Sequence, residues 1–477
     1  MRVSDYFKLG KTQPYLDFVD VPLDTDIEVF VDPTALRSLK SAWGHECASM
    51  VQHYFEAVLN RIKAGKNREA QALVSALSER NEFHLGFSAG RSQGHAFGSK
   101  SAESVWGALS KSQASTSGLL KDLEDTCLLI EGIGRDMISD AVCNIIRGPL
   151  IKYTQESCRY YGIPLTLGVA SGPIWNPHTG IWETAFVELP VTTYGTVILV
   201  PKILVRHRLS YQYDEYYTHY LLPEMQHAEL SANTALVQLL ADGGKRVTKK
   251  ALREKYGSNK LAVVEQTLKH PHALDDYKKN KEAHVPPPLD HQQLSEIEQN
   301  EPPRWDDLIA ALTALPTGDK YASDYEILIE KILSALFYPA LCNPTKQHQI
   351  HEGRKRIDIT YTNEARAGFF AWLSQHYPAA FIFVECKNYG SEIGNPELDQ
   401  LSGRFSPSRG QVGLLVCRSV EKPTTLEKRC IDTAKDHRGF ILTLTDKEIV
   451  SLIDAAKAGV QSLDFPLLRE KHRRLVD

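Results

Sequence analysis

Hydrophobic periodicity is clearest in the C-terminal part of the chain, where helix-like and strand-like stretches alternate. The six apolar residues 379–384 (AAFIFV) predict a strand buried on both faces. Upstream, Ile357, Ile359 and Tyr361 alternate with polar residues, as in a strand buried on one face. The expected elements are helix 324–338, strand 356–361, helix 365–376, strand 380–387, helix 396–405, strand 412–417, helix 424–437, strand 440–444 and helix 446–458. This order predicts a three-layer α/β domain.

The pattern before residue 224 is more mixed. Strand-like stretches occur at 28–31, 186–191 and 196–205, and helix-like stretches at 48–62 and 234–240. We therefore expect a larger α+β region over residues 1–223.

Two further boundaries follow from composition. Residues 284–304 contain five prolines and lack a regular period, which predicts a linker before a domain at 305–477. Between Lys245 and Lys281, eleven Lys or Arg residues face four Asp or Glu, so we expect a basic helical segment over 224–283. One interpretation is a solvated helical face. The other is a surface that contacts nucleic-acid phosphates, with Lys249, Lys250 and Arg253 on one helix as its candidates.

Overall composition fits a multidomain globular protein. The 477 residues are 42% hydrophobic and 24% charged, unlike a disordered chain or a coiled coil. A net charge of -4 excludes a uniformly basic, histone-like protein. The eight cysteines form no CxxC pair for zinc, and no apolar run is long enough to span a bilayer. We expect a cytoplasmic protein with no membrane partner.

Charged residues at the end of the buried strand are the first candidate chemistry. Glu385 and Lys387 follow the apolar run and share one face, whereas Cys386 points away. Charges in such a place are costly unless they serve each other or a ligand. The lone carboxylate of the neighbouring strand is Asp358. If the strands pair, Asp358 and Glu385 can converge on one magnesium ion, with the Cys386 carbonyl as a further ligand. The alternative interpretation is an ion pair at a strand end.

Helix 324–338 offers a third acid. Its apolar arc includes Tyr325, Ile329 and Leu333, and Glu326 lies on the flank of that arc. Glu330 lies further out. We prefer Glu326 because it can reach the end of the sheet, and Glu330 stays open as an alternative.

The helix, Asp strand, (D/E)xK strand and helix together resemble the PD-(D/E)XK nuclease superfamily, in its Mrr-like variant. The residues that carry the resemblance are YE at 325–326, GRKRID at 353–358, ECK at 385–387 and Gln400 in ELDQLSGRF. The resemblance implies that Asp358 and Glu385 hold magnesium, with manganese as a substitute. It further implies that Lys387 positions or activates the attacking water, that Glu326 is the helix acid and that Gln400 supports the site. Ile precedes Asp358 where the family motif has Pro, and an extra helix lies between Asp358 and Glu385.

The same resemblance implies a restriction-endonuclease-like α/β/α sandwich with a mixed central sheet, which hydrolyses DNA. By analogy, it further implies a role in bacterial restriction or anti-phage defence, with a homo-oligomer or a partner defence protein. Arg404 and Arg418 are predicted to be phosphate contacts or surface charges. Two alternatives stay open, which are a nucleic-acid-binding or signalling protein with an inactive nuclease-like module and an RNA-directed nuclease.

The N-terminal region resembles no family that we recognise. Its acidic run contains Asp125, Asp136 and Asp140 and could form a ligand or metal site, but we favour a structural role for these residues.

Overall fold

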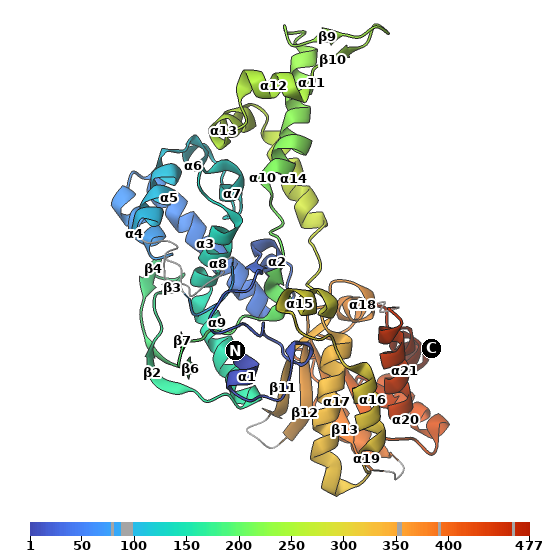
Figure 1. Cartoon of the computed structure of the whole chain (residues 1–477). Coiled ribbons are helices and arrows are strands. Elements are labelled where there is room, and N and C mark those ends of the chain that lie inside the picture. The colour runs from blue at the N-terminus through green and yellow to red at the C-terminus, as the bar shows by residue number, and fades with distance from the viewer. Residues whose placement is uncertain (78–80, 87–98, 351–354, 390–392, 460–462) are drawn as a thin grey trace. The chain divides into compact units, whose positions relative to one another are not determined.

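The structure is a computed structural model of the chain and describes residues 1–77, 81–86, 99–350, 355–389, 393–459 and 463–477 (Figure 1). Its contacts divide the chain into two compact units. Unit 1 comprises Met1–Lys8, Val21–Ser38 and Trp43–Pro288, and unit 2 comprises Leu9–Asp20, Leu39–Ala42 and Leu289–Asp477. Within the described ranges, no helix combines the length and the apolar content that crossing a bilayer requires.

Unit 1 is mainly helical. Its helices are α1 (Val3–Tyr6), α2 (Pro33–Arg37), α3 (Ala42–Lys63), α4 (Asn67–Ser75), α5 (Ser99–Lys111), α6 (Gln113–Ser117), α7 (Asp125–Leu129), α8 (Arg135–Ile145), α9 (Arg147–Tyr161), α10 (Tyr213–Tyr216), α11 (Leu222–Ser231), α12 (Lys249–Tyr256), α13 (Lys260–Lys269) and α14 (Pro271–Ala283). Its described strands form antiparallel pairs, which are β1 (Phe30–Val31) with β8 (Val205–Arg206), β2 (Thr166–Ala170) with β5 (Phe186–Leu189), β3 (Ile174–Asn176) with β4 (Ile181–Glu183), β6 (Val191–Thr192) with β7 (Gly195–Thr196), and β9 (Gln238–Leu239) with β10 (Lys245–Arg246).

Three predictions for unit 1 are wrong in detail. The apolar run 196–205 is buried but is not one strand, because its amides bond elsewhere: Ile198 N donates to Glu82 O and Leu199 N to Thr154 Oγ1. The expected helix at 234–240 is replaced by a turn and β9. The boundary after Pro223 falls inside α11, because proline is tolerated in the first turn of a helix. Residues 224–283 therefore belong to unit 1.

Unit 2 is built on a five-stranded mixed sheet. Its helices and strands are η1 (Gln13–Tyr15), α15 (His291–Glu298), α16 (Trp305–Ala314), η4 (Asp319–Tyr321), α17 (Ala322–Phe337), β11 (Leu341–Ile350), β12 (Lys355–Asn363), α18 (Gly368–His376), β13 (Phe381–Lys387), α19 (Asn395–Ser402), β14 (Val412–Cys417), α20 (Pro423–Lys435), β15 (Phe440–Thr445), α21 (Asp446–Lys457) and α22 (Pro466–Val476). The strands lie in the order β11-β12-β13-β14-β15. The pairs β11–β12 and β12–β13 are antiparallel, and the other two are parallel.

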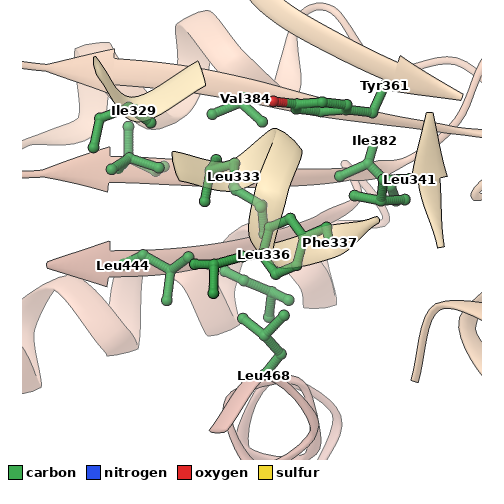
Figure 2. Packing of buried hydrophobic residues seen from close by; sticks show 14 of the residues in the cluster. Ile329, Leu333, Leu336, Phe337, Leu341, Tyr361, Ile382, Val384, Leu444 and Leu468 are labelled. Atoms are coloured by element: carbon green, nitrogen blue, oxygen red, sulfur yellow. The ribbon is translucent and has the colours of Figure 1, made fainter. Parts of the chain in front are cut away.

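Helices cover both faces of this sheet. On one face, Leu333 and Leu336 of α17 pack with Ile382 and Val384 of β13 (Figure 2). On the other face, α19 comes close to β14 at Gly413, where an added Cβ would lie 3.0 Å from atoms of Leu401 and Phe405. The predicted α/β class is thus confirmed. Each element predicted from 324 to 458 is present, but the structure also has strand β11 between the first predicted helix and the first predicted strand.

Several elements of unit 2 lack a clear sequence signal. Strand β11 is polar and contains Pro344, which an edge strand tolerates because one of its sides makes no ladder bonds. The segment 284–304 was expected to lack regular structure, but it contains α15. A capping box between Asp290 and Gln293 stabilises the N-terminus of this helix. Residues Leu9–Asp20 also belong to this unit, far in sequence from the rest of it.

The N-terminal segment contributes one charge to the interior of unit 2. Glu330 of α17 is fully buried, and Lys11 Nζ lies 2.9 Å from its Oε2, with Lys346 Nζ at 3.5 Å. We expect Lys11→Met to lower the free energy of unfolding by about 1–3 kcal/mol, because a buried carboxylate would lose its nearer cation. Denaturant unfolding of the full chain measures this loss. Lys11→Arg should keep most of the stability, and an unchanged midpoint in Lys11→Met would contradict the assignment.

Candidate functional site

Asp358 and Glu385 meet where the β12–β13 ladder ends. Ile359 pairs with Val384, so the next residues along the two strands, Asp358 and Glu385, stand opposite each other. Asp358 Oδ2 accepts a hydrogen bond from the backbone N–H of Cys386 at 2.9 Å. Directly opposed residues of an antiparallel pair point to the same face. The predicted convergence of the two acids is therefore present in the structure.

Glu385 is a buried carboxylate held by two cations. Its side chain is 1% exposed. Lys387 Nζ donates to Oε1 at 2.9 Å, and Arg404 Nη1 donates to Oε2. Burial raises the pKa of Glu385, and the nearby charge of Asp358 raises it further, whereas Lys387 and Arg404 act in the opposite direction. The two cations thus offset part of the rise in the pKa of Glu385 that burial and Asp358 cause.

Helix α19 supplies the other side of the site. Gln400 Oε1 accepts from Lys387 Nζ at 3.1 Å, so the ammonium bridges Glu385 and Gln400. Arg404 lies in the turn that follows α19 and reaches the same carboxylate as Lys387. The structure places the predicted Gln400 at the site. Sequence reasoning missed the part that Arg404 plays, although its spacing from Gln400 was a signal.

Glu326 lies nearer to this cluster than Glu330. The Cys386 side chain is half-buried, and desolvation raises the pKa of its thiol, with further increases from the negative charges of Asp358, Glu326 and Glu385. Glu326 is therefore close enough for its charge to act on Cys386. Glu330 instead pairs with Lys11 and Lys346. The placement favours Glu326 as the helix acid of the site.

The donor chemistry fits a hard divalent cation only in part. Magnesium is commonly bound by one or two carboxylates together with waters and substrate phosphates, and Asp358 and Glu385 are two such groups. The oxygens of Glu385 are engaged by Lys387 and Arg404, however, and Cys386 contributes its N–H to Asp358. In the described part of the chain, no group of three or more His, Cys, Asp or Glu residues is arranged to hold a metal ion.

The predicted phosphate contacts of unit 2 differ from expectation. Arg404 is 4% exposed and bound to Glu385, so it is not a surface group available to DNA. Arg418 is also largely buried, with Nε 3.1 Å from Asp446 Oδ2 and Nη2 donating to Leu315 O. Both arginines are used within the protein. Charge alone could not reveal this, because burial depends on where α19 and α21 pack.

The three candidates on α12 do not share one environment. Lys249 Nζ donates to Thr218 O, and Arg253 Nη2 donates to Thr218 Oγ1. Both side chains therefore hold α12 against the helical turn η3 (Tyr217–Leu221). Lys250 is 85% exposed and lies 3.9 Å from Glu254. Lys250 is thus the residue of this set that is most accessible to a phosphate.

Asp125, one acid of the run in unit 1, is accounted for within the fold. Asp125 is fully buried and pairs with Lys278 of α14, and its Oδ2 also accepts from two backbone amides. Its neighbour Glu124 pairs with Arg37. These contacts support the structural interpretation of the run.

Comparison with known proteins bears on the N-terminal part. A family model described as a domain of unknown function (DUF8370) matches residues 8–212. The match covers less than half of the chain and ends before the candidate site. No curated protein and no solved structure gave a match to this chain.

Removal of Arg404 tests the electrostatics of the site. We expect Arg404→Met to destabilise unit 2 by about 2–4 kcal/mol at pH 8, because Glu385 loses one of two cations while buried. The pKa of Glu385 in the folded state would then rise further above its value in the unfolded state. At a pH between these two values, the folded state binds a proton that the unfolded state has released. The loss should therefore shrink as the pH falls toward 4.5.

Denaturant unfolding at several pH values measures this loss. Arg404→Lys, which keeps the charge, is the matched control. A destabilisation of Arg404→Met that is independent of pH would mean that Arg404 acts by packing and not by its charge.

Proposed function

We propose that unit 2 is a metal-dependent nuclease domain of the restriction-endonuclease-like type, which hydrolyses phosphodiester bonds of DNA. The observation that carries the proposal is the convergence of Asp358, Glu385, Lys387 and Gln400 at the end of β13. The order of the mixed sheet, with helices on both faces, supports it. The family match ends at residue 212, includes none of these four residues, and neither supports nor opposes the proposal.

The chain's own residues have distinct roles in this proposal. Asp358 and Glu385 would hold magnesium or manganese, which when bound supplies Lewis-acid charge and a water of lowered pKa. Lys387 presents a positive donor whose position is fixed by Glu385 on one side and Gln400 on the other. A donor fixed in this way can stabilise charge that develops on a phosphate during attack. Glu326 adds a negative charge from the α17 side.

A second candidate function rests on the engagement of Glu385. Because Lys387 and Arg404 already balance its charge, the cluster is also consistent with a structural ion-pair network in an inactive nuclease-like module that binds nucleic acid or signals. An RNA substrate in place of DNA is the remaining alternative. One assay with plasmid, linear DNA and RNA in magnesium, manganese or EDTA separates these three outcomes.

Substitution of the clustered residues tests the catalytic assignment. We expect Asp358→Asn, Glu385→Gln and Lys387→Met each to reduce cleavage by about 10²-fold or more, because each removes a group assigned to the reacting phosphate or its metal. Cleavage should require a divalent ion. Glu326→Gln should reduce the rate by a smaller factor.

Asp399→Asn is the matched control, since Asp399 precedes Gln400 on α19 but pairs with Arg438. Circular dichroism and thermal unfolding establish that each variant is folded. Cleavage at the wild-type rate by the variant that combines Asp358→Asn, Glu385→Gln and Lys387→Met would refute the catalytic assignment. A loss of cleavage in Glu330→Gln but not in Glu326→Gln would assign the role of the helix acid to Glu330, one turn along α17.

The basic segment of unit 1 generates a separate prediction for nucleic-acid binding. We expect Lys250→Ala to weaken binding to unrelated duplexes equally and to lower the slope of log K against log salt by about 0.9, the effect of one lost phosphate contact. A salt titration with short duplexes measures both quantities. Lys250→Arg keeps the charge and should bind like the wild type.

The triple change of Lys249, Lys250 and Arg253 to alanine should weaken binding at least as much as Lys250→Ala. Part of its effect would come from the lost contacts to Thr218. An unchanged slope in both variants would leave the segment as a solvated helical face.

A further inference from the structure

A cavity of about 470 Å³ lies in unit 2, apart from the cluster at the end of β13. It is lined by residues that follow β14, by α20, by β15, by the start of α21 and by α22. Its volume is within the range of pockets that hold small-molecule ligands, roughly 300–1,000 Å³. The carboxyl ends of parallel strands, here β14 and β15, are a common place for such pockets in α/β sheets.

The charged side chains of this cavity are mostly positive. Four basic residues and two acidic ones line it, namely Arg418, Lys447, Lys471, Arg474, Glu427 and Glu448. Lys471 Nζ lies 2.7 Å from Glu448 Oε1, and Arg474 Nη1 lies 3.5 Å from Glu427 Oε1. Each of these acids therefore has a cation beside it. Arg418 pairs with Asp446 and Arg474 also pairs with Glu470, so Lys447 supplies the remaining positive charge of the lining. Lys447 is exposed at its rim.

The remainder of the lining is largely apolar. Val420, Leu426, Cys430, Leu442 and Leu475 contribute hydrocarbon or thiol surface. Pro423 of α20 also lies at the cavity, as does Thr445, which forms the capping box of α21 with Glu448. A ligand that fits these features combines an apolar body with a negatively charged group.

We propose that this cavity binds a nucleoside phosphate, with the base against the apolar side chains and the phosphate near Lys447 and Lys471. This proposal does not depend on the nuclease assignment. The cavity is nevertheless connected to α17, because Arg418 pairs with Asp446, whose Oδ1 accepts from Tyr325 OH at 2.8 Å. The test variants therefore leave Arg418 unchanged.

Isothermal titration of the full chain with AMP, ATP and inorganic phosphate, in EDTA and low salt, tests the proposal. We expect saturable binding of the nucleotides that weakens as salt is added, since the attraction is partly electrostatic. Lys447→Glu should raise the dissociation constant about tenfold by reversing a charge at the rim. Val420→Trp should also weaken binding by occupying space in the cavity.

Lys435→Glu on α20 is the matched control, because it reverses an exposed charge on the same unit but does not line the cavity. Nucleotides should also raise the midpoint of thermal unfolding of the wild type. Absence of nucleotide binding at millimolar concentration would overturn the proposal. Equal affinity for inorganic phosphate and AMP, or equal loss in Lys435→Glu and Lys447→Glu, would overturn it as well.

Discussion

The geometry of the candidate site in unit 2 depends on the pairing of the buried Glu385 carboxylate with Lys387 and Arg404. An ionised carboxylate that is almost fully buried is unstable unless opposite charges and hydrogen bonds surround it. Lys387 comes from the same strand, but Arg404 must come from the turn that follows α19. The close approach of α19 at Gly413 makes this reach available. The same approach brings Gln400 to Lys387, so one electrostatic requirement fixes the positions of three side chains.

The two faces of β13 have different roles, because one carries the charged side chains of the site and the other packs in the apolar core. Glu385 and Lys387 project toward α19, whereas Ile382 and Val384 project toward α17 and belong to the core (Figure 2). Cys386 lies on the α17 side, and its backbone N–H is bound by Asp358. The site is thus rigid for two reasons, since its charged face is tied by ion pairs and its other face is packed. Such rigidity is what positioned catalytic groups require.

The sequence predicted those parts of unit 2 that have a strong local pattern. The apolar run at 379–384 and the alternation at 357–361 identified β13 and β12, and the expectation that Asp358 and Glu385 converge followed from them. Strand β11 escaped because it is polar and contains Pro344, and only its edge position makes it stable. The inclusion of residues Leu9–Asp20 could not be predicted, because a contact such as Lys11 with Glu330 leaves no local signal.

The basic segment shows why a count of charges does not measure a binding surface. Of its cations, Lys278 forms an ion pair with the buried Asp125 of unit 1, and Lys260 donates hydrogen bonds to the carbonyls of Ile130 and Ile133. Burial lowers the pKa of Lys260, which is the opposite of what an exposed phosphate contact would show. Lysine side chains that already bind backbone carbonyls or buried acids within the protein cannot contact phosphates and release counterions from DNA. Any affinity of this segment for nucleic acid must therefore come from the cations that remain exposed, and Lys250 is the predicted candidate with an 85% exposed side chain.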